Sequence, residues 1–314
     1  MSDVLDYGTS DPYAVPEGHR SGFVTVIGRP NVGKSTLMNQ FVGEKVAIVS
    51  SKPQTTRSRI LGILTEGAFQ VIFVDTPGIH RPLHKLGEIM VSTATNAIPE
   101  SDVALFMVDV SVEPQKEDRM IADLLEARTD APTILVLNKM DLLEPEKVQA
   151  HTEAYWDVAP FYDEWMMTTA TKGVNLGELL ERIVARLPEG PRYYPQTYMT
   201  DQTERQIVAE LIREQVLRHT YHEVPHSVAV VVEEFAEREE GVTYIAANVF
   251  VERASQKGII IGRRGAMIRK IGSRARKAVE RLVGGKVYLD LWVKVREGWR
   301  EDERQLRQLG FDGP

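Results

Sequence analysis

Short apolar runs recur through the first part of the chain and alternate with amphipathic stretches. The runs cover Phe23–Ile27, Val71–Val74, Val103–Val108 and Thr133–Leu137. Continuous apolar runs are typical of parallel strands covered on both faces, and helices usually connect such strands. Leu37 and Phe41, four residues apart after the first run, fit the buried side of a helix. The pattern predicts an α/β domain over residues 21–188.

The pattern changes after Pro188, and residues 189–200 are predicted to form a linker. Beyond it follow a helix-like stretch (Thr203–His219) and two strand-like runs (Ser227–Phe235 and Val242–Val251). A helix pair (residues 259–282) and a strand with alternating apolar and polar residues (Val287–Arg296) complete the pattern. This order predicts an α+β domain over residues 201–314. Residues 1–20, rich in Gly, Pro, Ser and Asp, are predicted to be a flexible tail.

The first apolar run leads into a phosphate-binding motif. Its residues are Gly28, Arg29, Pro30, Asn31, Val32, Gly33, Lys34, Ser35 and Thr36. The glycines let backbone N–H groups turn inward on a polyphosphate, Lys34 reaches the β and γ phosphates, and the Ser35 hydroxyl can ligate Mg²⁺. An ordinary glycine turn is the alternative, but the strand before the motif and the helix after it argue against that. We therefore expect the chain to bind a nucleoside triphosphate.

Polar residues after a later strand predict which base is bound. The Asp141 carboxylate can accept hydrogen bonds from the ring N–H and the exocyclic amino group of guanine, a pair that adenine does not offer. Asn138 would tie this loop to the phosphate motif, and Lys139 would cover one face of the base. Further along, the Ala170 N–H, between Thr169 and Thr171, is placed to meet the guanine carbonyl oxygen. Guanine is the predicted base.

The segment Asp75-Thr76-Pro77-Gly78 also follows an apolar run. Asp75 would hold Mg²⁺ through water and the Gly78 N–H would meet the γ phosphate, so that loss of this phosphate releases the segment beyond. Upstream, either Thr55 or Thr56 would supply a second hydroxyl to the metal, and Thr56 is our working assignment beside Ser35 and Asp75.

Length and composition limit the number of domains and the class of protein. The 314 residues suit two domains, and 43% hydrophobic residues allow a core in each. No apolar run approaches the roughly 20 residues that span a bilayer, and the acidic start lacks the pattern of a secretory signal. The chain has no cysteine, which excludes disulfides and thiolate metal sites. We expect a cytoplasmic protein.

The formal charge of −7 argues against a generic binder of polyanions, but the charge is unevenly spread. From Lys257 to Arg281, nine Lys or Arg residues stand against one acid, a local balance of +8. A basic stretch inside an acidic protein indicates nucleic-acid binding more strongly than uniform basicity does, although a solvated helix face is the commoner reason for a basic run.

A glycine loop within this stretch favours nucleic acid. Gly262-Arg263-Arg264-Gly265 has the G-x-x-G form that clamps a nucleic-acid backbone in KH domains. The predicted RNA-binding set is completed by Lys257, Arg269 and Lys270. The order of elements around the loop is that of the type II KH fold. For Tyr288 and Trp292 on the last strand, covering the sheet is favoured over base stacking.

The nucleotide-site segments, in this order, resemble the translation-factor-related class of small GTPases. With the KH elements after them, the chain resembles the Era family of bacterial GTPases over residues 21–300. The resemblance implies an α/β P-loop GTPase domain followed by an α+β type II KH domain, with GTP or GDP and Mg²⁺ as cofactors. It also implies a cytoplasmic monomer that binds small-subunit ribosomal RNA near its 3′ end, favours RNA in the GTP form, and acts in assembly of the small ribosomal subunit. Peripheral association with the inner face of the cell membrane is a further hypothesis.

One position distinguishes this chain from the better-known signalling GTPases. Ile79 follows Gly78, where signalling GTPases carry the glutamine that orients the attacking water, so unaided hydrolysis should be slow. Lys34, Asn31 and Gly78 are therefore the predicted catalytic residues. Several relatives use an asparagine at the position of Asn31 to hold a monovalent cation, which suggests the hypothesis that K⁺ binds here. Thr169 stands where relatives usually have serine.

Two functions of other classes remain open at this stage. The chain could be a metabolic phosphotransferase that uses ATP, which Asp141 argues against and nucleotide competition would decide. It could also be an RNA-binding scaffold with a vestigial nucleotide site, and GTP-dependent RNA affinity would decide that.

Overall fold

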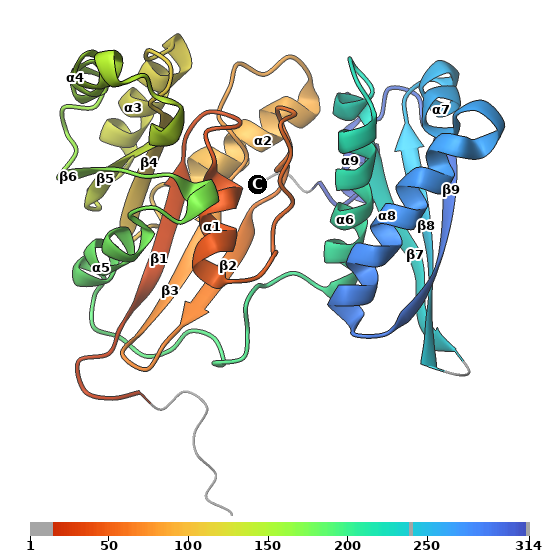
Figure 1. The fold of residues 1–314 in the computed structure, drawn as a ribbon, viewed down its shortest axis with the longest axis horizontal. Helices are drawn as coiled ribbons and strands as arrows, with labels where there is room; N and C mark the ends of the chain where they lie inside the picture. The colour runs from red at the N-terminus through yellow and green to blue at the C-terminus, as the bar shows by residue number, and fades with distance from the viewer. Residues whose placement is uncertain (1–14, 239–240, 312–314) are drawn as a thin grey trace, which may run out of the picture.

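The computed structural model describes residues 15–238 and 241–311 (Figure 1). Its strands form two sheets, one of six strands and one of three. The predicted tail, residues 1–20, lies mostly outside the described residues; its end forms a turn in which His19 N donates to Pro16 O at 3.2 Å. Within the described part of the chain, no helix is both long and apolar enough to cross a bilayer.

The six-stranded sheet has the order β2-β3-β1-β4-β5-β6, in which β2 runs antiparallel to β3 and the other pairs are parallel. The strands are β1 (Arg20–Ile27), β2 (Ile60–Thr65), β3 (Phe69–Asp75), β4 (Val103–Asp109), β5 (Thr133–Asn138) and β6 (Glu164–Met167). The helices are α1 (Lys34–Val42), α2 (Lys85–Asn96), α3 (Lys116–Arg128), α4 (Val148–Val158) and α5 (Leu176–Arg186). The four predicted runs fall in β1, β3, β4 and β5.

Apolar side chains pack on both faces of this sheet. In β4, Leu105 and Met107 join the cluster that contains Leu37 of α1, whereas Phe106 joins the cluster that contains Ile121 of α3. Because both faces are covered, polar side chains concentrate where the strands end. The carboxyl ends of β1, β3 and β5 therefore present their polar residues at one edge, where open α/β sheets bind ligands.

The three-stranded sheet pairs β7 (Ala229–Arg238) antiparallel with β8 (Val242–Val251), and β8 parallel with β9 (Lys286–Val295). The helices here are α6 (Glu204–His219), α7 (Ala254–Ile261), α8 (Ala266–Val283) and α9 (Glu303–Gln308). Ile271, Ala275 and Val279 of α8 are buried in one cluster with Val208 and Ile212 of α6. The order α6-β7-β8-α7-α8-β9 is the one predicted for the type II KH fold.

The two halves of the molecule share an apolar contact. Leu86 and Met90 of α2 are buried in one cluster with Trp299 and Leu306 from the C-terminal segment. The fully buried Trp299 donates from Nε1 to Ser227 O at 3.1 Å, and Leu86 N donates to Arg300 O at 3.0 Å. The segment that follows Gly78 along the chain therefore leads directly into the contact between the halves.

The predicted linker, residues 189–200, runs along the first sheet. Ile63 N in β2 donates to Met199 O at 2.8 Å, and Thr200 forms a bridge with Gly62. Gln70 in β3 accepts from Tyr193 N at 2.8 Å. The segment covers the outer edge of β2, an edge that would otherwise expose unpaired backbone groups.

Candidate functional site

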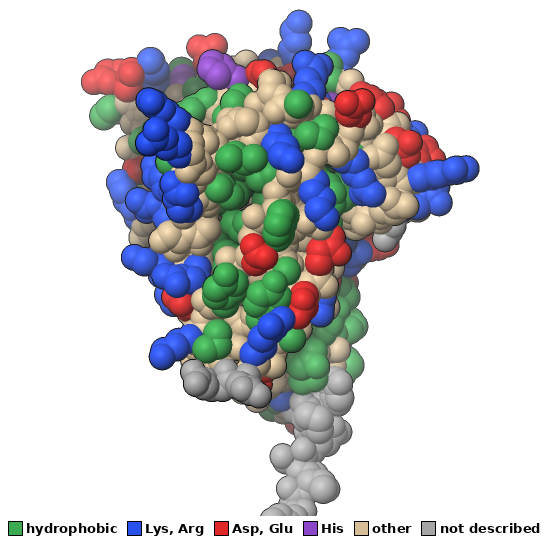
Figure 2. Space-filling model, turned by 90° about the vertical axis from the view of Figure 1, so that its right-hand side faces the viewer, with side chains coloured by type: hydrophobic (Ala, Val, Ile, Leu, Met, Phe, Trp, Pro, Cys, Tyr) green, Lys and Arg blue, Asp and Glu red, His purple; other side chains and the backbone are tan. Residues whose placement is uncertain are grey.

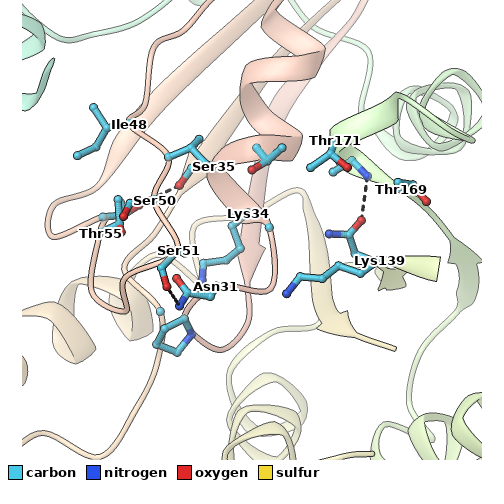
Figure 3. A pocket seen from close by; sticks show the side chains of 18 of the residues that line it. Asn31, Lys34, Ser35, Ile48, Ser50, Ser51, Thr55, Lys139, Thr169 and Thr171 are labelled. Carbon is cyan, nitrogen blue, oxygen red and sulfur yellow. Dashed lines mark hydrogen bonds between the residues drawn. The ribbon is translucent and has the colours of Figure 1, made fainter. Parts of the chain in front are cut away.

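A cavity of about 620 Å³ opens at the carboxyl ends of β1, β3 and β5. One side is formed by α1 and the other by the irregular segment between α1 and β2, residues 43–59, which we call the switch loop. Figure 3 shows side chains from α1, the switch loop and the later polar loops facing the same space. Predicted residues in the lining are Pro30, Asn31, Gly33, Lys34, Ser35, Thr36, Thr55, Thr56, Gly78, Asn138, Lys139, Asp141, Thr169, Ala170 and Thr171, both alternative threonines among them. Its size suits a nucleotide.

The loop before α1 is suited to bind phosphate. Lys34, the first residue of the helix, is 6% exposed, and its ammonium donates to the carbonyl oxygens of Gly28 (3.0 Å) and Arg29 (2.9 Å). Burial lowers the pKa of Lys34 to about 8, and the nearby Asp75 opposes that shift. An anion at this point would meet free N–H groups, the positive end of the helix dipole and an ammonium group.

Three oxygen ligands meet beside this loop. The Ser35 hydroxyl donates to Asp75 Oδ2 at 2.5 Å and lies 2.9 Å from Thr56 Oγ1. Thr55 points elsewhere, because its hydroxyl donates to Lys52 O at 2.6 Å. Of the two threonines left open by the sequence, Thr56 is therefore the one that lies with Ser35 and Asp75.

The carboxylate in this group is fully buried. Burial raises the pKa of Asp75 to about 6, while Lys34, Ser35 and Thr56 act in the opposite direction. The second oxygen, Asp75 Oδ1, is buried and has no hydrogen-bond partner among the described residues. Mg²⁺ prefers oxygen ligands of this kind: two hydroxyls and a carboxylate whose second oxygen accepts no hydrogen bond from the described residues. These residues therefore fit a magnesium site.

At the other end of the cavity, Asn138 joins three loops. Its Nδ2 donates to Val32 O at 2.7 Å, and its Oδ1 accepts from Ala170 N at 3.0 Å. Asp141 lies 3.0 Å from the Lys172 ammonium, and this hydrogen bond lowers the pKa of the Asp141 carboxyl. The carboxylate therefore stays ionised at neutral pH and can accept two N–H donors of a base.

Some predicted residues lie outside the cavity lining: Gly28, Arg29, Val32, Asp75, Thr76 and Pro77. The Arg29 side chain donates to the buried Asp118 of α3 at 2.7 Å and so faces away from the cavity. The Thr76 hydroxyl donates to Val26 O at 3.0 Å. Ile79 is fully buried in the apolar core, so neither its chemistry nor its position lets it orient water.

Six lining residues were not predicted: Ile48, Val49, Ser50, Ser51, Gln54 and Leu142. Five of them belong to the switch loop. Ser51 O accepts from Asn31 Nδ2 at 3.0 Å, and Gln54 Nε2 lies 2.6 Å from His80 Nε2. The signal in the sequence was the polar stretch Ser50–Gln54, but without a hydrophobic period it could not show which of its residues face the cavity.

In the second half, the glycine loop lies between α7 and α8. Gly262 and Gly265 have φ of 70° and 75°, and Arg264 between them has φ of 51°, a conformation uncommon for a residue with a side chain. Arg263 and Arg264 are exposed. Arg269 donates from Nη2 to Arg264 O at 2.7 Å and so braces the loop, while Lys257 and Lys270 flank it. Two exposed cations are thus held on a strained, well-defined turn.

The outer face of the small sheet carries aromatic side chains. Figure 2 shows the side of the molecule on which hydrophobic side chains gather among charged ones. Tyr288 and Trp292 are 63% and 60% exposed, and the ring of Tyr288 stacks on that of Tyr244 at 5.8 Å between centroids. Trp292 Nε1 donates to the carboxylate of Asp290 at 2.9 Å.

Two family models match the chain. The model described as a 50S ribosome-binding GTPase matches residues 23–139, and a KH domain model matches residues 223–300. The GTPase Era of Heliobacterium modesticaldum is 49% identical over 293 residues, which cover 93% of this chain and 97% of that protein. The GTPase Era of Leuconostoc citreum is 48% identical over the same length and the same shares.

Two solved structures are similar over nearly the whole chain. A crystal structure of Era in complex with MgGDPNP and nucleotides 1506–1542 of 16S ribosomal RNA has a TM-score of 0.90 at 38% identity, covering 93% of this chain and 99% of that one. A variant of Aquifex aeolicus Era bound to GDP.AlF4⁻ has a TM-score of 0.89 at 37% identity, with the same coverage. The expected α/β GTPase domain and KH domain are confirmed, and the phosphotransferase alternative is set aside. The chain belongs to the Era family of GTPases.

Proposed function

We propose that this protein is a GTP-controlled RNA-binding switch that binds 16S ribosomal RNA near its 3′ end and acts in assembly of the small ribosomal subunit. The observation that carries the proposal is the joining of the nucleotide cavity and the Arg263-Arg264 loop in one chain that aligns over 93% of its length with an Era bound to MgGDPNP and that RNA. The residues assigned above then have distinct roles.

The GTPase domain, residues 21–188, would bind the nucleotide. The loop from Gly28 to Thr36 holds the phosphates, with Lys34 and the Gly78 N–H on the γ phosphate. Ser35, Thr56 and Asp75 hold Mg²⁺, directly or through water, and the ion supplies positive charge that the departing phosphates need. Asp141 selects guanine, the Ala170 N–H meets its carbonyl oxygen, and Asn138 fixes the two loops that carry them.

Because Ile79 cannot orient the attacking water, hydrolysis depends on other groups that stabilise the charge of the transferring phosphate. Asn31 already links the phosphate loop to Ser51 of the switch loop, and we infer that K⁺ binds beside it and supplies part of the missing charge. A slow intrinsic rate follows, because the water-orienting side chain of other GTPases has no equivalent at this position.

The KH domain, residues 201–314, would bind RNA, and residues 189–200 would connect it to the GTPase domain. Gly262 and Gly265 let the backbone of the RNA approach, and Arg263, Arg264, Lys257, Arg269 and Lys270 neutralise its phosphates. We take the protein to act as a cytoplasmic monomer on the small subunit. Peripheral contact with the inner face of the cell membrane stays a hypothesis, which flotation with lipid vesicles would test.

The test combines two measurements on the full chain. Phosphate release should be slow and selective for GTP over ATP. Fluorescence anisotropy with a labelled fragment of the 16S 3′ end should show tighter binding with GDPNP than with GDP. Equal RNA affinity in the two nucleotide states would contradict the switch and favour an RNA-binding scaffold with a vestigial nucleotide site.

A further inference from the structure

The switch loop is held by helix α6 of the KH domain. Arg213 Nη2 donates to the carbonyl oxygen of Thr55. Glu214, the next residue, accepts from Val49 N at 3.3 Å and from the Lys45 ammonium at 2.7 and 2.6 Å. Two adjacent side chains of one domain thus reach both ends of a loop in the other domain, and this loop forms one side of the nucleotide cavity.

The two α6 side chains in these contacts are closed to solvent. Arg213 and Glu214 are each 1% exposed. The charge of Arg213 is balanced by Glu210, which accepts from Arg213 Nε at 2.7 Å. The charge of Glu214 is balanced by Lys45 of the switch loop and by Arg218 of its own helix. Removing one partner of a buried ion pair is strongly destabilising, because the other charge is left buried alone. The helix and the loop therefore hold each other in one arrangement.

A second buried cation anchors the end of the switch loop. Arg57 is 3% exposed and donates to the carbonyl oxygens of Val228 (2.6 Å), His226 (3.0 Å) and Pro225 (3.2 Å) in the turn before β7. Burial, and next the charge of Arg213, lower the pKa of Arg57 to about 9. The residues on either side of Thr56 are thus both bound to the KH domain.

The bond from Arg213 acts on the peptide group that joins Thr55 to Thr56. A peptide group is planar and rigid, so fixing its oxygen also fixes the direction of the Thr56 N and Cα atoms. The Thr56 hydroxyl lies 2.9 Å from Ser35 Oγ and 3.4 Å from Asp75 Oδ2. A shift of this peptide group would carry the hydroxyl away from both.

We propose that Arg213 is a positioning residue for the nucleotide site: it orients the peptide group of Thr56 so that the hydroxyl reaches the metal, while Glu214 and Arg57 fix the rest of the switch loop. The KH domain thereby completes the magnesium site of the GTPase domain. The inference rests on the proposed role of Thr56. Because coupling between two sites is reciprocal, Mg²⁺ and GTP together would also hold α6 in place.

The test is the Mg²⁺ dependence of GTP hydrolysis in the full chain. In Arg213→Met we expect the half-saturating Mg²⁺ concentration to rise about tenfold or more, the effect of losing one well-placed ligand. GDP affinity measured in EDTA should stay within about twofold of the parent, since it needs no metal. Arg213→Lys, which keeps the charge beside Glu210 and one donor, should recover part of the loss. Arg205→Gln is the control, because Arg205 lies on the same helix, is exposed and donates to Glu233 O in its own domain.

A double-mutant cycle separates positioning from general damage. If Arg213 acts through Thr56, then in a Thr56→Ala background Arg213→Met should add no further Mg²⁺ effect. Additive effects, or a parent-like Mg²⁺ dependence in Arg213→Met, would overturn the inference. If Arg213→Met does not fold, Arg213→Lys and Glu214→Gln carry the test, each with an expected rise of about threefold or more. A Thr56→Ala variant with parent Mg²⁺ dependence would instead refute the proposed metal site.

Discussion

Gly265→Asp is expected to separate RNA binding from nucleotide binding. Gly265 has φ of 75° and caps the N-terminus of α8, and a Cβ atom added there would lie 3.0 Å from Arg269 Nη1. The new carboxylate would therefore stand beside the exposed Arg263 and Arg264, where the phosphates of an RNA strand are expected. It would also draw Arg269 away from its bond to the Arg264 carbonyl oxygen.

The size of the effect follows from Coulomb's law. A unit charge about 6 Å from a phosphate costs about 0.7 kcal/mol at the dielectric constant of water and about 2.8 kcal/mol at the value typical near a protein surface. A G-x-x-G loop clamps about four nucleotides, so more than one phosphate is affected. Since about 1.4 kcal/mol corresponds to tenfold, RNA affinity should fall at least tenfold. The slope of log affinity against log salt concentration should become shallower by about the amount that one phosphate contact contributes.

The matched control is Gly284→Asp. Gly284 also has a positive φ, 67°, and ends the same helix, but an added Cβ would have no atom within 4 Å. Both variants carry the same new charge and similar backbone strain, but only the charge at position 265 lies in the loop and beside Arg269. Anisotropy with labelled 16S fragment and GDPNP measures RNA binding, and GTP affinity and basal phosphate release are measured on the same samples. Stimulation of hydrolysis by RNA should vanish in Gly265→Asp. If both variants bind RNA like the parent, or if both lose it equally, the loop is a structural turn and not a clamp.

Three further predictions concern the nucleotide site and the domain contact. Asp141→Asn should lower GTP affinity at least tenfold and favour xanthosine triphosphate, because an amide cannot accept from both guanine donors; unchanged affinity in competition binding would remove Asp141 from the base site. Hydrolysis should be faster in KCl than in NaCl for the parent but not for Asn31→Ala, and equal rates for the parent in both salts would end the K⁺ hypothesis. Burial and the charge of Arg57 lower the pKa of His226, so the unfolded chain binds the proton more readily. The contribution of His226 to stability should be complete at pH values above the histidine pKa of the unfolded chain, near 6.5, and should decline as the pH falls below that pKa. In thermal unfolding between pH 7.5 and 5.5, His226→Gln should flatten this decline.

The nucleotide site was largely predictable because its signals are local. The phosphate loop needs a strand, a glycine turn and a helix that are adjacent in sequence, and strands of a parallel sheet bring Gly78 and Asn138 to the same edge. What the sequence left open depends on contacts between distant residues. The choice of Thr56 over Thr55 follows from where Ser35 and Asp75 lie, and no pattern of spacing encodes that.

Distant partners also explain which side chains the sequence could not place. Arg29 belongs to the phosphate motif, and Arg269 was assigned to the RNA-binding set. In the structure Arg29 is paired with Asp118 of α3, and Arg269 braces its own loop. In sequence a charged residue looks the same whether it is solvated or paired, because only the fold brings the partner near. The burial of Arg57 and Arg213 could not be predicted for the same reason.

The composition of the domain contact suits a switch. Its apolar part centres on Leu86, Met90 and Trp299, whereas its polar part buries Arg57 and Arg213. Burying paired charges adds little net stability, since the loss of hydration offsets the attraction, but it penalises every arrangement in which a pair is broken. Such an interface specifies one geometry without being hard to open. Because a ligand can shift an equilibrium only by its differential affinity for the two states, a contact of modest net strength can be closed or released by Mg²⁺, GTP and RNA.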